Sequence, residues 1–185
     1  IPELEAQELL STVEGYEDFV QALMNVAPVP IGFEDIPGDS KGYFHTEEKR
    51  IAVQENMSES QTLKTMVHEV AHSMLHNKEI NRDDLMEAPA KDRNTKEVEA
   101  ESVAYTVCQH FGIDTSDYSF GYIAGWSSGK DMKELKSSLD TIRKTASELI
   151  IGIEGALQEL QLNRAIEKEQ SKECILLIQN EDLTE

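Results

Sequence analysis

The sequence has few cysteines, few basic residues and no long apolar run, and each shortage excludes a class of protein. Its 185 residues include two cysteines, Cys108 and Cys174, which are too few and too far apart for a small scaffold held by disulfides. No segment approaches the ~20 consecutive apolar residues that cross a bilayer. We therefore expect a cytoplasmic protein with reduced thiols and no membrane partner.

Positive charge is also scarce. Lysine and arginine together number 17 against 36 acidic residues, which gives a formal net charge of −19. A chain this acidic repels phosphate backbones, so we expect no direct nucleic-acid binding by this segment. Any such binding would come from a further domain upstream.

The order of apolar and turn residues predicts an α+β fold. Apolar residues at helical spacing predict a first helix within residues 3–24, which Pro28 and Pro30 would end. Two short strand-like runs, 42–45 and 50–54, flank a polar tip and predict a hairpin within a small antiparallel or mixed sheet.

Two central helices follow the predicted hairpin. Ser58 with Gln61 forms a capping-box pattern that predicts a helix from there to about Asn77. Asn94 or Thr95 is the expected N-cap of a second helix, which Gly112 would end.

A long C-terminal helix is predicted from Asp131 and Glu134, another capping-box pair. Its apolar residues alternate three and four apart: Met132, Leu135, Leu139, Ile142, Ala146, Leu149, Ile153, Ala156 and Leu160. At ~1.5 Å per residue it would be too long for a small domain to cover. We expect either a bend near Gly152 and Gly155 or packing on a partner helix or second copy through 132–160.

These elements suggest three segments. We expect one folded domain over 1–128 and a helical extension over 129–170, packed on that domain or on a partner. Residues 173–179 resemble a strand, so 171–185 would begin a further module. Both ends are expected to continue into other modules.

The strongest functional signal is His68-Glu69-Val70-Ala71-His72, an H-E-x-x-H pattern. On a helix, residues four apart project from the same side, so both imidazoles can reach one ion. Glu69 lies close enough around the axis to hold a water without being a ligand. The apolar stripe of this helix lies nearly opposite: Leu63, Met66, Val67, Val70 and Met74.

Hydrolytic zinc sites use three protein ligands and keep one position open. On the helical wheel of the following helix, Glu97 falls inside the apolar stripe, Glu101 at its edge and Glu99 well away. We therefore predict Glu97 as the third ligand. Its competing role is to form the return half of a capping box with Asn94. Glu101 is predicted to orient a ligand imidazole or to serve as an alternative ligand. His76 is predicted to be structural, because a fourth ligand would close the open position.

Two segments resemble a known family: His68–His76 (HEVAHSMLH) and Glu97–Tyr105 (EVEAESVAY). They are similar to ImmA/IrrE-type zinc metallopeptidases and to the zincin domain of ArdC-like antirestriction proteins of bacterial conjugative elements. The likeness covers about residues 30–128. It implies a zincin fold, a Zn2+ ion, Glu97 as ligand and Glu101 in the place of an aspartate.

The predicted function is zinc-dependent peptide-bond hydrolysis within a larger bacterial mobile-element protein, with a protein or peptide as substrate. Glu69 is the predicted catalytic base. The candidates for stabilising the oxyanion are Tyr105, Tyr118, Tyr122 and Arg93. The alternative is a metal-stabilised interaction or antirestriction module that cleaves nothing.

Overall fold

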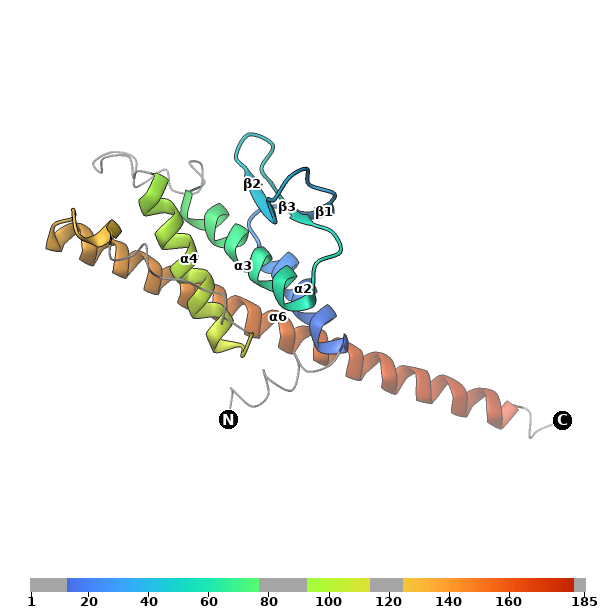
Figure 1. The fold of residues 1–185 in the computed structure, drawn as a ribbon. Helices are drawn as coiled ribbons and strands as arrows, with labels where there is room; N and C mark the ends of the chain where they lie inside the picture. The colour runs from blue at the N-terminus through green and yellow to red at the C-terminus, as the bar shows by residue number, and fades with distance from the viewer. Residues whose placement is uncertain (1–12, 77–92, 114–124, 182–185) are drawn as a thin grey trace.

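The computed structural model describes residues 13–76, 93–113 and 125–181. Figure 1 shows a small sheet beside a group of helices, one of them much longer than the others. The predicted α+β class, with a small mixed sheet and a long C-terminal helix, is confirmed. The main elements are α2 (Val13–Val26), β1 (Ile31–Glu34), β2 (Gly42–His45), β3 (Arg50–Gln54), α3 (Glu59–His76), α4 (Arg93–His110) and α6 (Met132–Glu181). None of the described helices is both long enough and apolar enough to span a membrane.

The sheet has the order β1-β3-β2. Strands β2 and β3 pair antiparallel, with Tyr43 opposite Ala52, which confirms the predicted hairpin. Strand β1 pairs parallel to β3 on its other side. The turn of the hairpin includes Lys49 at a positive φ of 53°. Strand β2 is therefore an edge strand, with one side free of β partners among the described strands.

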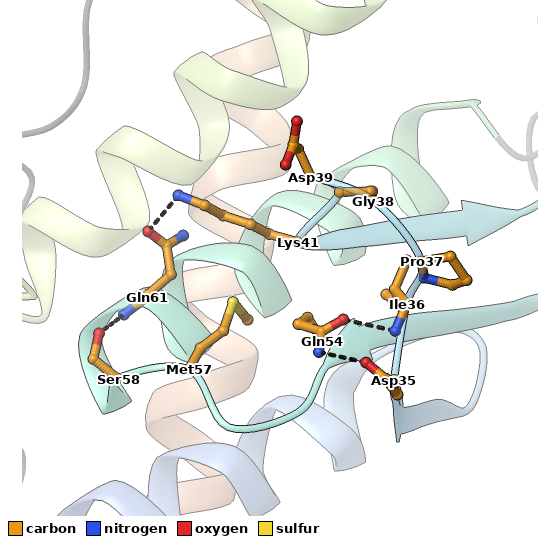
Figure 2. A pocket seen from close by; sticks show the side chains of 11 residues that line it. Asp35, Ile36, Pro37, Gly38, Asp39, Lys41, Gln54, Met57, Ser58 and Gln61 are labelled. Atoms are coloured by element: carbon orange, nitrogen blue, oxygen red, sulfur yellow. Dashed lines mark hydrogen bonds between the residues drawn. The ribbon is translucent and has the colours of Figure 1, made fainter.

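The loop between β1 and β2 is fastened to β3 and α3 (Figure 2). The backbone N–H of Ile36 donates to Gln54 Oε1 at 2.6 Å, and Lys41 Nζ donates to Gln61 Oε1 at 2.9 Å. The loop borders a hollow of about 600 Å³ that no histidine or cysteine lines. These bonds fix the start of β2 beside α3.

One apolar core joins the sheet to α2, α3, α4 and α6. The predicted stripe of α3 is confirmed, since Leu63, Met66, Val67 and Val70 are buried in this core. The other elements contribute Phe19 and Leu23 from α2, Ile51 and Val53 from β3, Val103 and Val107 from α4, and Leu149 and Ile153 from α6. Cys108 is buried in the same core.

The helix ends match the predictions in part. Ser58 Oγ accepts from the N–H of Gln61 at 3.3 Å, as expected for the start of α3. Gly112 ends α4 at a φ of 68°, and Ile113 N–H bonds Cys108 C=O at 2.9 Å, a Schellman geometry. The predicted start of α4 is wrong, because Asn94 already lies inside the helix.

The strand predicted over 173–179 is wrong, because α6 continues to Glu181. Its N-terminus does carry the predicted capping box, with reciprocal bonds between Asp131 and Glu134. No glycine or proline follows Gly155, and extending an existing helix costs little per residue. A short apolar run such as Ile175 to Ile178 therefore does not interrupt it.

No bend at Gly152 or Gly155 is seen, since α6 is helical throughout and runs straight in Figure 1. A Cβ at Gly152 would lie 3.2 Å from Val26 Cγ1, so this glycine allows close approach of α2. Ile153 is buried in the core, whereas Leu139 and Leu162 are 63% and 61% exposed. The partner helix or dimer proposed for 132–160 stays a prediction.

Replacing Gly42 with alanine should destabilise the protein. A Cβ there would lie 2.6 Å from Thr65 Cγ2 and 3.0 Å from the carbonyl oxygen of Ala52. Because the Ala52 oxygen belongs to the backbone of β3 and the Thr65 methyl is buried, we expect a loss of about 1–3 kcal/mol in the free energy of unfolding. Urea titration followed by circular dichroism measures it.

Gly32→Ala is the matched control, because a Cβ at that strand glycine meets nothing within 4 Å. Its stability should equal or slightly exceed that of the parent, since glycine in a strand carries an entropic cost. Equal stabilities of the two variants would contradict the close packing of β2 on α3.

Candidate metal centre

The two histidines of the H-E-x-x-H pattern lie on one face of α3. Their rings are 4.7 Å apart between centroids, and His68 Nε2 lies 3.1 Å from His72 Nε2. Both side chains are partly buried, at 22% and 14% exposure. The opposite face of α3 is packed in the core, so the helix holds the two imidazoles rigidly.

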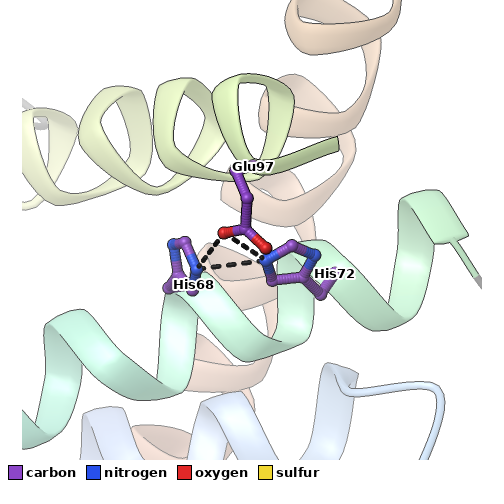
Figure 3. A group of neighbouring side chains, drawn as sticks. All are labelled: His68, His72 and Glu97. Carbon is purple, nitrogen blue, oxygen red and sulfur yellow. Dashed lines mark hydrogen bonds and ion pairs between the residues drawn. The ribbon is translucent and has the colours of Figure 1, made fainter. Parts of the chain in front are cut away.

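Glu97 reaches the same point from α4. Its Oε2 lies 3.3 Å from His72 Nε2 and 3.7 Å from His68 Nε2 (Figure 3). These three donor atoms lie close enough together to hold one metal ion. The hydrogen bonds to His68 and His72 lower the pKa of Glu97 well below its ordinary value.

The geometry fits a small tetrahedral ion. Metal–ligand bonds of 2.0–2.1 Å place neighbouring ligands of a tetrahedral zinc site about 3.3–3.4 Å apart. The three separations here, 3.1, 3.3 and 3.7 Å, bracket that value. Two imidazoles and a carboxylate also suit borderline ions such as zinc better than calcium or magnesium, which prefer oxygen alone.

The burial of the α4 glutamates differs from the helical-wheel prediction. Glu97 was expected on the buried face, yet its side chain is 48% exposed, while Glu99 is fully buried. The wheel assumed one covered face, whereas α4 packs on α3 and also on α6. Glu97 also does not cap Asn94, since its carboxylate points to the histidines.

Glu101, one turn beyond Glu97, lies on the other ring nitrogen of His68. Its Oε2 is 3.0 Å from His68 Nδ1, and its side chain is 26% exposed. Burial tends to lower the pKa of His68, but the carboxylates of Glu101 and Glu97 outweigh it and raise that pKa to about 10. Glu101 is thus placed to orient the ring of His68 while leaving Nε2 directed at Glu97.

Glu69 lies beside the histidines and against β2. It is 7% exposed, and the backbone N–H of Phe44 on the edge strand hydrogen-bonds to its carboxylate. Burial raises the pKa of Glu69, although the neighbouring His68 and His72 oppose the shift. A carboxylate whose charged form is disfavoured is suited to accept a proton and return it.

An open cleft of about 960 Å³ contains these groups. One wall is the edge strand β2 and its turn, and the other is formed by α3 and the start of α4. Its lining residues are Ser40, Gly42, Tyr43, Phe44, Thr46, Glu47, Lys49, His68, Glu69, His72, His76, Arg93, Lys96 and Glu97. An extended ligand in this cleft would therefore contact the metal ligands and Glu69 together.

The four candidates for an oxyanion donor separate only in part. Arg93 lines the cleft, and Tyr105 does not. Tyr118 and Tyr122 lie outside the described residues. Arg93 is thus the candidate that the described geometry brings to the cleft.

The sequence predicts a structural role for His76 and no role for Glu99. His76 Nδ1 lies 3.0 Å from His72 Nδ1, and its Nε2 lies 3.8 Å from Glu99 Oε2. Burial lowers the pKa of His76, which favours its neutral form. The sequence signal for this contact is His76, a third histidine four residues after His72, together with three glutamates on the next helix.

Comparison with known proteins agrees with a site of this kind. Residues 4–118, more than half of the chain, match the family described as "Putative metallopeptidase family (DUF6782)". The chain belongs to this family.

A curated relative is an uncharacterized protein of Bacillus anthracis, pXO2-81, which is 37% identical over 127 residues. The match covers 68% of this chain and 20% of that protein, so the chain spans about a fifth of its relative's length. No solved structure matches the chain.

Proposed function

We propose that this chain is a zinc-dependent peptidase of the zincin type, with His68, His72 and Glu97 as the metal ligands. The observation that carries the proposal is the convergence of three donor atoms, at separations of 3.1–3.7 Å, beside the buried carboxylate of Glu69. Family membership supports a metal-dependent protease.

The ligand set leaves room for catalysis. Three protein ligands leave one position of a tetrahedral ion open, and the open cleft gives access to it. When bound, zinc supplies a Lewis acid that polarises a carbonyl oxygen and makes water acidic enough to lose a proton near neutral pH. Glu101, bonded to His68 Nδ1, orients that ring and is not a ligand in this proposal.

Glu69 acts as the general base and then as the general acid. Its carboxylate accepts a proton from the attacking water and delivers it to the amine that leaves when the peptide bond breaks. The hydrogen bond from Phe44 N–H holds the carboxylate at the cleft wall during both steps. Arg93, which lines the same cleft, is our candidate for stabilising the developing oxyanion.

The substrate in this proposal is an extended segment of protein. Strand β2 is an edge strand that lines the cleft, and an extended peptide can pair with such an edge through main-chain hydrogen bonds. We further propose that the chain works in the bacterial cytoplasm as part of a larger mobile-element protein of the antirestriction or conjugation type.

The test is cleavage with and without zinc. The purified chain, loaded with zinc, is incubated with unfolded casein and a mixed peptide library, and new termini are identified by mass spectrometry. We expect cleavage that stops when a chelator removes the metal and returns when zinc is restored. A zinc-loaded chain that produces no new termini would overturn the proposal and favour a metal-stabilised interaction module.

A further inference from the structure

We propose that His76 and Glu99 are positioning residues, which hold the imidazole of His72 through its Nδ1 so that Nε2 remains directed at the metal. This inference rests on the proposed zinc site. It assigns a role to a buried histidine and a buried glutamate that neither the H-E-x-x-H pattern nor the ligand set requires.

The contact begins at the ring nitrogen of His72 that faces away from Glu97. His72 Nδ1 lies 3.0 Å from His76 Nδ1, with ring centroids 5.1 Å apart. The side chain of His76 is 8% exposed, so water competes little for this hydrogen bond. Both residues are on α3, one turn apart, and the helix fixes their spacing.

If His72 binds a metal, it must be the donor in its hydrogen bond with His76. An imidazole that binds a metal through Nε2 must carry its proton on Nδ1, so His72 would donate and His76 Nδ1 would accept. His76 must then carry its own proton on Nε2. That nitrogen is buried, makes no hydrogen bond with any residue that the structure describes, and lies 3.8 Å from Glu99 Oε2.

Glu99 ends the chain of contacts on a second helix. Its side chain has 0% exposure, and its Oε1 accepts a hydrogen bond of 2.7 Å from Ser138 Oγ on α6. A carboxylate buried this deeply is costly unless donors surround it. The hydroxyl of Ser138 is one donor, and the Nε2–H of His76 would be the second.

Each ligand histidine therefore has its own anchor on α4. Glu101 bonds His68 Nδ1 directly at 3.0 Å, whereas Glu99 acts on His72 through the intervening ring of His76. Removing such a partner of a metal-bound histidine weakens metal binding or activity by typically 10–100-fold. The anchors act on different rings, so either can be removed alone.

Two variants of His76 separate positioning from packing. His76→Leu keeps apolar bulk and removes the acceptor, while His76→Asn keeps an oxygen at the position of Nδ1. We expect zinc affinity, measured by competition with a chromophoric chelator, to fall by about 10–100-fold in H76L and to recover most of that loss in H76N. Equal affinities of H76L and the parent chain would overturn the proposal.

Glu99→Gln tests the far end of the contact, with Ser138→Ala as its milder companion. In long-range ¹H–¹⁵N spectra of the zinc-loaded chain, we expect a slowly exchanging Nδ1–H of His72. That proton should exchange faster in E99Q and disappear from the slow set in H76L. An unchanged His72 signal in both variants would mean that Glu99 and His76 only fill the core.

The outcomes also distinguish this inference from the proposed function. If the parent chain binds zinc and cleaves peptides while H76L and E99Q match it in affinity and spectrum, the positioning role alone fails. If the parent chain binds no zinc, the proposed function and the positioning role fail together. Circular dichroism of each metal-free variant verifies that the comparison is between folded proteins.

Discussion

Glu69→Gln should abolish most peptide hydrolysis while leaving zinc bound. Glutamine keeps the size of the side chain and can still accept the hydrogen bond from Phe44 N–H, but it cannot take a proton from water. Positioned acid–base groups contribute about 10²–10⁴-fold, so we expect the cleavage rate to fall by that factor. The measurement combines cleavage kinetics with metal analysis of the same samples.

Glu47→Gln is the matched control, because Glu47 lines the same cleft from the hairpin turn. It should cleave close to the parental rate.

Burial raises the pKa of Glu69, so its ionised form disfavours folding at neutral pH. Metal-free E69Q should therefore unfold at the same or a higher temperature than the parent. A Glu69→Gln variant that cleaves as fast as the parent would show that Glu69 is not the general base.

His68→Ala and His72→Ala should each leave the protein almost free of zinc after dialysis against micromolar metal. Either change removes one of two imidazoles whose Nε2 atoms are 3.1 Å apart and leaves two ligands, which is too few for a tight site. Inductively coupled plasma mass spectrometry gives the zinc-to-protein ratio. His110→Ala, at the far end of α4 and paired with Glu154, should keep its zinc.

The same measurement ranks the glutamates. Glu97→Ala should lose zinc as the histidine variants do, whereas Glu101→Ala should bind it about 10–100-fold more weakly, because it removes only a support of His68. If Glu101→Ala lost the metal and Glu97→Ala kept it, the assignment of the third ligand would be reversed.

The pairing of His68 with His72 was the part of the candidate site most accessible from sequence. The i, i+4 spacing of His68 and His72 fixes their geometry as soon as the segment is helical. The helical wheel selected Glu97 as a buried residue, whereas its side chain is 48% exposed and reaches the histidines because α4 packs beside α3. Glu99 could not be predicted, because its burial depends on α6 packing on α4, and that contact joins residues 39 positions apart.

The elements show the same division. The N-cap bond at Ser58 and the full capping box at Asp131 are local signals, and both appear in the structure. The strand predicted over 173–179 rests on a short apolar run, and that run continues the helix that precedes it. The pairing of β1 with β3 brings Ile31 opposite Ile51, a parallel register that no local pattern specifies.

The length of α6 has a mechanical consequence. The last described ion pair between α6 and another helix joins Arg164 to Asp18 of α2, at 2.5 Å. Residues 165–172 are exposed. From Arg164 to Glu181 the helix extends about 25 Å further, at ~1.5 Å per residue. A continuous helix of this length fixes a separation. A molecule attached to its C-terminal end would be held at a set distance from the cleft, whereas a flexible tether would let that molecule diffuse into the cleft.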